Sequence, residues 1–195
     1  MKTIKLIALI LSISFSLTGC FGDKNIAVGT ELGDTNFVNT NFIKNKIEFS
    51  ALPKNLCTYI NNDKVKELYP DASKILTDDG KTFMSKSCRF LVYIGDGDFN
   101  YLTGTIFASE DQLAEGEKWE ETWELKKKMS KSSEYVSNLG KAAIWKAKKR
   151  ELSIKMDGYS VVITAPGSVF KEEEVAKNRD YKKIAIAIAE STNLF

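Results

Sequence analysis

Three cysteines are the residues of this chain with the most distinctive chemistry, because the sequence contains no histidine. The lack of imidazole excludes nucleophile–histidine pairs and histidine-ligated metal sites. The cysteines stand at positions 20, 57 and 88, and these spacings match no zinc motif. Acylation, disulfide formation and thiol reactivity remain, and the sequence around each cysteine decides among them.

Cys20 follows a segment that is typical of a secretory signal peptide. Residues 1–19 contain two lysines near the start, an apolar run over 6–17 and small residues at the end. A transmembrane helix needs about 20 apolar residues, and serines dilute this shorter run. The sequence therefore predicts export, with removal of residues 1–19.

The four residues Leu17-Thr18-Gly19-Cys20 resemble the lipobox of bacterial lipoproteins. The resemblance implies that Cys20 is lipidated and is the first residue of a mature chain of residues 20–195. Several acyl chains on one residue would hold the protein durably at a membrane while its polypeptide stays in water. Phe21 stands where an Asp would imply inner-membrane retention in diderm bacteria, so the resemblance favours the outer membrane, facing the periplasm. An ordinary secretory signal with a chance cysteine is the alternative.

Charge argues against a nucleic-acid partner. The whole chain has 28 basic and 26 acidic residues, and residues 1–19 hold two lysines and no acid. The mature chain therefore has equal numbers of both signs and lacks the basic excess of nucleic-acid-binding proteins. We expect the basic runs 126–128 and 146–150 to be solvated faces. If either is functional, anionic lipid head groups near the anchor are the expected partner.

Cys57 and Cys88 are the only thiols left after lipidation of Cys20, and export places them in an oxidising compartment. We expect a disulfide between them, which would close a loop of about 30 residues and contribute roughly 3–4 kcal/mol. A reactive thiol is the alternative, but it would lack a histidine partner and a Cys-x-x-Cys spacing.

Other chemical motifs are incomplete. Asp96, Asp98 and Asn100 match the first ligand positions of an EF-hand loop, but the later glycine and glutamate positions fail, and a hairpin turn explains the same residues. Ser168 and Lys171 have a Ser-x-x-Lys spacing without the partner motifs of β-lactam-binding enzymes. We therefore expect no catalytic residues, no cofactor and no metal.

The tryptophans and the acidic run around 115–124 have structural explanations. Trp119, Trp123 and Trp145 could form an aromatic ligand surface, but packing of a helix on the sheet accounts for them better. The five glutamates of the acidic run are expected on the outer face of that helix, at Glu115, Glu117, Glu120, Glu121 and Glu124.

We expect a lipidated N-terminus and flexible tether over residues 20–46, followed by one α+β domain over 47–195. The tether is rich in Asn, Thr, Gly and Asp. It also contains large apolar residues such as Phe37 and Phe42, so its last part should dock on the domain.

The domain is expected to contain an antiparallel sheet of about five strands, with two or three helices packed mainly on one face. Asn61 to Pro70 should hold a short helix. Longer helices are expected over 110–132 and from 172 to about 192, the second despite the strand-like alternation of 184–189. Gly95–Asp98 and Asp157-Gly158 should form hairpin turns, the second of type I′, and Pro166-Gly167 should break the last strand. The expected strands are 89–94, 101–108, 142–147, 151–156 and 159–164.

Three short motifs weakly resemble those of small exported lipoproteins of unknown function. They are Leu56-Cys57, Cys88-Arg89-Phe90 and Leu139-Gly140-Lys141-Ala142-Ala143. The resemblance implies a compact α+β domain that binds something outside the cytoplasm, and it implies no enzymatic activity.

The sequence thus predicts a lipid-anchored, non-catalytic binding or structural protein of the bacterial envelope. Its expected partner is an envelope protein or a small ligand, to which the domain would present the sheet face or an edge. Two alternatives stay open: an immunity-type lipoprotein that inhibits a periplasmic toxin or enzyme, and an envelope hydrolase that works without histidine.

Overall fold

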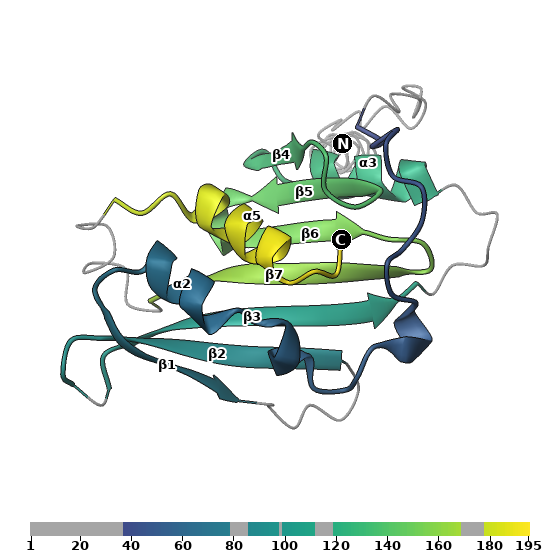
Figure 1. Cartoon of the computed structure of the whole chain (residues 1–195). Coiled ribbons are helices and arrows are strands. Elements are labelled where there is room, and N and C mark those ends of the chain that lie inside the picture. Colours follow the sequence, from purple (N-terminus) through teal and green to yellow (C-terminus); the bar gives the residue numbers. More distant parts are fainter. Residues whose placement is uncertain (1–36, 79–85, 98, 112–118, 169–177) are drawn as a thin grey trace, which may run out of the picture. The chain divides into compact units, whose positions relative to one another are not determined.

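The computed structural model describes an α+β fold around one antiparallel sheet of seven strands, in the order β1-β2-β3-β7-β6-β5-β4 (Figure 1). The described residues are 37–78, 86–97, 99–111, 119–168 and 178–195. The predicted fold class is confirmed, but the sheet has seven strands rather than about five.

The element bounds are as follows. The strands are β1 (Ala72–Asp78), β2 (Lys86–Ile94), β3 (Tyr101–Glu110), β4 (Ser133–Val136), β5 (Ala142–Lys146), β6 (Glu151–Lys155) and β7 (Tyr159–Gly167). The described helices are α2 (Asn62–Leu68), α3 (Trp119–Lys128) and α5 (Tyr181–Ser191), with short 3-10 helices η1 (Phe49–Ala51), η2 (Leu56–Tyr59) and η3 (Ala147–Lys149).

The two strands that the sequence did not predict, β1 and β4, lie at opposite edges of the sheet. Edge strands bury less apolar surface and carry more polar residues than central strands. In β1 most side chains are at least partly exposed, and a bulge between Ala72 and Lys74 interrupts the alternation. Strand β4 is only four residues long. Neither segment therefore has a clear apolar alternation.

The last strand continues through Pro166-Gly167, so the expected break there is wrong. Two residues of β7, Ala165 and Pro166, stand opposite Gly104 of β3, which makes a bulge. The ladder between β6 and β7 has already ended at Thr164. Proline therefore sits where its missing N–H costs no ladder hydrogen bond.

The two longer predicted helices are only partly covered by the described residues, and some of those residues are not helical. β3 extends to Glu110, where a helix was predicted, and α3 starts at Trp119; the intervening residues 112–118 lie outside the described part. α5 starts at Tyr181, after Asp180 caps it by accepting a hydrogen bond from the Lys183 N–H at 3.0 Å. Residues 172–177 of the expected closing helix also lie outside the described part.

Segment 184–189 is helical, as predicted, and buries one face. Ile184, Ala185 and Ile188 of α5 pack into the main core. These positions recur with the helical period, so an apolar stripe forms although the sequence alternates isoleucine with alanine.

The predicted hairpin between β6 and β7 is confirmed, but its turn is not of type I′. Gly158 has a φ of 77°, whereas Asp157 keeps a negative φ, and type I′ needs both positive. The buried Asn45 side chain explains the difference, because it bonds the backbone of Asp157 twice: it donates to the carbonyl at 2.8 Å and accepts from the N–H at 2.9 Å. The predicted turn between β2 and β3 is also present, closed by a hydrogen bond from Ile94 N–H to Asn100 O of 2.8 Å.

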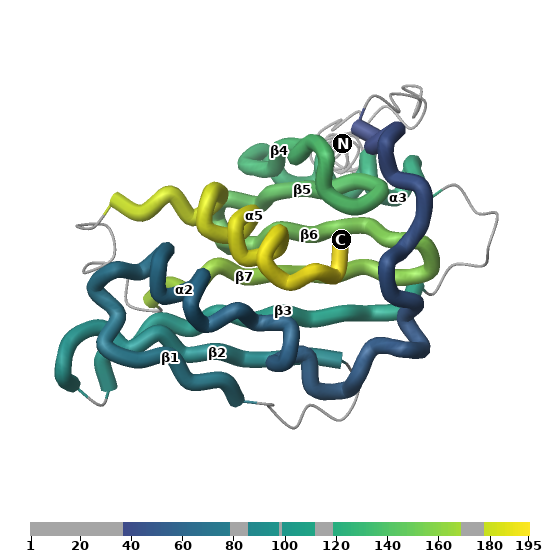
Figure 2. The backbone as a smooth tube through the Cα atoms, in the orientation of Figure 1, coloured from purple at the N-terminus to yellow at the C-terminus, as the bar shows by residue number. Residues whose placement is uncertain are grey.

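The chain before α2 crosses the ends of the strands from the β4–β5 turn to β2 (Figure 2). Asn39 N–H donates to Lys141 O at 2.8 Å, and Ser87 N–H donates to Lys54 O at 3.0 Å. Phe42 packs against the main core. Residues 37–46, which belong to the expected tether, therefore lie on the sheet, while residues 20–36 are outside the described part.

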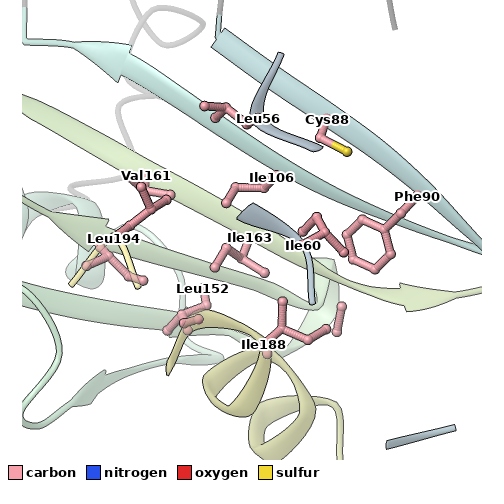
Figure 3. Close-up of a cluster of buried hydrophobic side chains, with 14 of the residues drawn as sticks. Leu56, Ile60, Cys88, Phe90, Ile106, Leu152, Val161, Ile163, Ile188 and Leu194 are labelled. Atoms are coloured by element: carbon pink, nitrogen blue, oxygen red, sulfur yellow. The ribbon is translucent and has the colours of Figure 1, made fainter. Parts of the chain in front are cut away.

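The main core lies between one face of the sheet and the layer formed by η2, α2 and α5. The close-up in Figure 3 shows part of this core, where Ile188 lies near Leu152 and Ile163 of the sheet. Its fully buried side chains include Phe90, Ile106 and Ile163 from the sheet and Ile188 from α5. We call this side the helix-covered face. In Figure 1, α2 and α5 lie in front of it.

The expectation that the helices gather on one face is not confirmed, because α3 packs on the other side. Ala143 and Trp145 of β5 belong to the main core, whereas Ala142 and Ile144 form a second cluster with Trp123 of α3. Alternate residues of a strand point to opposite faces. The opposite face is thus covered by α3 near β4 and β5.

Candidate binding surface

Cys57 and Cys88 form the predicted disulfide, with a Cα–Cα distance of 4.8 Å. Asn55 positions Cys57 by accepting a hydrogen bond from its N–H at 2.8 Å, which starts η2. Cys88 is on the helix-covered face of β2 and is 1% exposed. The bridge therefore fixes η2 to the sheet and leaves neither sulfur as a free thiol. Cys20 lies outside the described residues.

The other chemically suggestive residues are dispersed. Trp145 lies in the main core, on the opposite face of the sheet from Trp123 and Trp119, so the three tryptophans form no common surface. Asp96 and Asn100 belong to the β2–β3 turn. Within the described ranges, no three His, Cys, Asp or Glu side chains are placed to hold a metal ion. Ser168 is described, but Lys171 is not.

The second face of the sheet remains partly exposed over β1, β2, β3 and β7. Its side chains alternate with those of the main core, and we call this surface the open face. It consists of Leu76, Arg89, Leu91, Tyr93, Tyr101, Thr103, Thr105, Phe107, Val162 and Thr164. Among the described helices only α3 lies on this side, next to β4 and β5.

Apolar and aromatic side chains of the open face are paired across strands. Leu76 stands opposite Leu91, and Tyr93 opposite Tyr101 with ring centroids 5.5 Å apart. Leu76 is 46% exposed and Tyr101 41% exposed. Aromatic rings with an apolar body and a polar tip are favoured at binding surfaces.

Polar groups run beside this apolar strip. Arg89 forms an ion pair with Asp78, its neighbour on β1. In the same row across the sheet stand Thr105 of β3 and Thr164 of β7. The hydroxyl groups and the ion pair offer hydrogen-bond donors and acceptors next to apolar surface, which is the composition expected of a protein–protein contact.

A buried polar cluster lies at the α3 end of the same face, on β6. Lys155 is 4% exposed; it donates to Asp111 and to Met156 O, the latter at 2.6 Å. At the other end of β6, Lys146 Nζ donates to Glu151 Oε1 at 2.7 Å, and Ser153 Oγ donates to the same oxygen at 3.1 Å. Each buried charge is thus paired, which is the usual requirement for charge burial.

The electrostatics of this cluster shift two pKa values. Burial lowers the pKa of Lys126, and the positive charge of Lys146 lowers it further, while Glu151 and Asp111 oppose the change. Burial by itself would raise the pKa of Glu151, but the hydrogen bond and charge of Lys146, with Ser153 and Lys126, bring it below its ordinary value. Glu151 is therefore held as a carboxylate, which suits a structural ion pair rather than a general acid.

Aromatic rings from the N-terminal chain, α3 and β4 pack together beside the polar cluster. Phe37 stacks on Tyr135 with centroids 4.6 Å apart and meets Trp119 edge-on at 6.2 Å. The ammonium groups of Lys141 and Lys155 lie 5.1 and 5.7 Å from the Trp119 ring. Trp119 thus packs the helix onto the sheet, as predicted, with cation–π support.

A cavity of about 340 Å³ lies between residues 37–41 and 135–138. Asn39 ties its two walls together by donating to Gly140 O at 2.8 Å. The lining contains asparagine, threonine, serine and aromatic side chains but no acidic or basic ones. It supplies no acid–base pair and no charged anchor for a ligand, so it is a weaker candidate than the open face.

The sequence predicted three of the four strands of the open face, β2, β3 and β7, but not β1 and not the surface itself. Alternation along a strand such as β3 does not tell which face of the sheet a helix covers. Glu124 was expected on an outer helix face, but it is 7% exposed and bonded to Lys128 at 2.6 Å. The sequence did not indicate the Lys155–Asp111 pair, because its partners are far apart in sequence and Lys155 stands at a polar position of an alternating strand, where a solvent-exposed side chain is expected.

No described helix has the length and apolar character that crossing a membrane requires. Comparison with protein-family models, curated proteins and solved structures yields no match for this chain.

Proposed function

We propose that this chain is a lipid-anchored protein of the bacterial cell envelope, held through Cys20 at the outer membrane in a diderm organism, and that its domain binds another envelope protein without catalysing a reaction. The lipobox resemblance supports the anchor. The open face of the sheet supports the binding role, and it is the observation on which that role rests.

The shape and composition of the open face favour a protein over a small molecule. Small ligands bind in concave sites that enclose most of their surface, whereas this face is a partly exposed sheet surface spread over four strands. Its exposed Leu76 and Tyr101, with the half-buried Tyr93, suit a partner of comparable extent.

The polar cluster on β6 supports a structural rather than a catalytic role. Lys146, Glu151 and Lys155 each have a charged partner, and the lowered pKa of Glu151 keeps that group ionised at neutral pH. A general acid would need the opposite shift.

Site-specific photo-crosslinking tests the binding role. A benzophenone amino acid is placed at Tyr101, on the open face, in the full-length lipidated protein and activated in intact cells. The matched control carries the same group at Glu190, an exposed residue of α5 on the other side of the sheet. The proposal predicts a discrete protein adduct from position 101 and none from position 190. No adduct at 101, or the same adducts at both positions, would reject the open face as the binding surface.

A further inference from the structure

The fold brings the two lysine runs of the sequence together at one end of α3. β4 follows α3 and pairs with β5, so that Ser133 stands opposite Lys146. Ala147 N–H donates to Ser132 O at 3.4 Å, which places η3 directly beside the turn that follows α3. Residues 126–131 and 148–149 therefore lie close together where α3 ends. We call this the basic end.

The basic end concentrates positive charge in an otherwise balanced chain. Residues 124–151 contain nine Lys or Arg and three Glu. Lys131, Lys148 and Lys149 are exposed and have no carboxylate partner among the described residues. These three ammonium groups are thus available to an external anionic surface.

Two large apolar side chains project from the same end. Leu125 is 52% exposed and Met129 is 80% exposed. They lie one helical turn apart, with Met129 N–H donating to Leu125 O at 2.9 Å. The buried Trp123 points to the sheet, so this pair belongs to the outward side of the helix. Exposed apolar residues flanked by lysines are typical of segments that rest on a membrane surface.

The anchor can reach this end. Phe37 is the first described residue, and it packs against Tyr135 of β4 and Trp119 of α3. Sixteen residues lie between Cys20 and Phe37, and the chain that joins the two can span at most about 60 Å. α3, with ten residues, is only about 15 Å long. A lipid on Cys20 therefore leaves the basic end within reach of the same bilayer.

From these observations we propose that the basic end is a second membrane contact: Leu125 and Met129 enter the headgroup region of the bilayer, and Lys131, Lys148 and Lys149 contact anionic lipid phosphates. This inference rests on the proposed lipid anchor at Cys20. The anchor raises the local concentration of the lipid, so that a weak electrostatic and apolar contact suffices.

An environment-sensitive fluorophore tests this contact. Met129→Cys is labelled in the full-length lipidated protein, whose other cysteines are acylated or in the disulfide, and the protein is reconstituted into vesicles of phosphatidylethanolamine with phosphatidylglycerol. Phe99→Cys is the matched control, because Phe99 is 94% exposed in the β2–β3 turn, at the other side of the sheet. The inference predicts a blue shift and quenching by brominated lipids at position 129 and neither at position 99.

The dependence of the blue shift on lysine charge and the dependence of membrane binding on the lipid anchor are measured separately. The triple variant Lys131→Glu, Lys148→Glu, Lys149→Glu, or vesicles of neutral lipid alone, should abolish the blue shift at position 129 while the protein still floats with the vesicles. Flotation without any shift at 129, or equal shifts at 129 and 99, would overturn the inference and leave the anchor intact. Failure of the reconstituted protein to float would overturn both the anchor and the contact that depends on it.

Discussion

Tyr159 joins the sheet to the chain that precedes it. Its ring is fully buried beside Phe49, and its hydroxyl group donates to Ile47 O at 2.8 Å. Burial raises its pKa to about 12, with smaller contributions from Glu48 and Tyr59. The hydroxyl is thus retained in its neutral, donating form in the native protein.

This raised pKa predicts a loss of stability in alkali. The phenol of Tyr159 has a pKa of about 12 in the native protein against an ordinary value of 10.0, so its contribution to stability is complete below pH 10 and is lost as the pH rises toward 12. Tyr159→Phe should remove that part of the pH dependence and cost about 1 kcal/mol at neutral pH, through the lost hydrogen bond. Urea unfolding of both proteins between pH 8 and about pH 11 measures this difference. Parallel pH profiles would contradict the assignment.

The lowered pKa of Glu151 predicts a loss of stability in acid rather than in alkali. Its pKa in the native protein lies below the ordinary value, so its contribution is present above the unfolded-state pKa and is lost as the pH falls through the native pKa. Glu151→Gln should flatten the loss of stability in acid and leave Lys146 without its partner. Urea midpoints from pH 7 to pH 3 test this, with Glu190→Gln as an exposed control. An unchanged acid profile would mean that the pair does not form.

At the scale of the elements, η2 depends on a covalent link to β2. The disulfide closes a loop with a sequence separation of 31 residues. The double variant Cys57→Ala, Cys88→Ala should therefore lower the free energy of unfolding by about 3 kcal/mol in the chain-entropy model. Reduced wild-type protein should behave similarly. A stability unaffected by both treatments would show that the two thiols are not joined in the folded protein.

The bulge between β3 and β7 depends on Gly104. A Cβ atom at this position would overlap the ring of the fully buried Phe90 and approach Pro166 at 2.8 Å. Gly104→Ala should therefore destabilise the protein by about 1–3 kcal/mol, as overpacking of a core does. Gly97→Ala is the matched control, because its added Cβ meets only Asn100 at an ordinary 3.6 Å. Equal unfolding midpoints for the two variants would contradict this account of the bulge.

Local patterns identified the central elements and failed at edges and bulges. The alternation of Leu152, Ile154 and Met156 predicted β6 because both neighbours of that strand are in the sheet and one face is core. No such pattern exists in β4, whose residues face partners supplied by α3 and by the N-terminal chain. The continuation of β7 past Pro166 depends on Gly104, more than 60 residues earlier, which no local pattern reports.

At the scale of the whole molecule, two separate surfaces carry the side chains that we propose make external contacts. The open face of β1, β2, β3 and β7 presents paired apolar and aromatic side chains beside threonines and an ion pair. The basic end of α3 presents lysines around Leu125 and Met129. The cysteine spacings and lysine runs were visible in the sequence, whereas the meeting of the two runs depends on the pairing of β4 with β5.

The proposed membrane anchor and the second membrane contact both depend on lipidation of Cys20. Metabolic labelling tests this lipidation most directly. Cells that express the full-length protein are grown with radioactive palmitate, and the protein is isolated and its label measured. Wild-type protein and a Cys57→Ser, Cys88→Ser control should carry the label, and Cys20→Ser should lose it. A Cys20→Ser variant labelled as strongly as wild type would contradict the account.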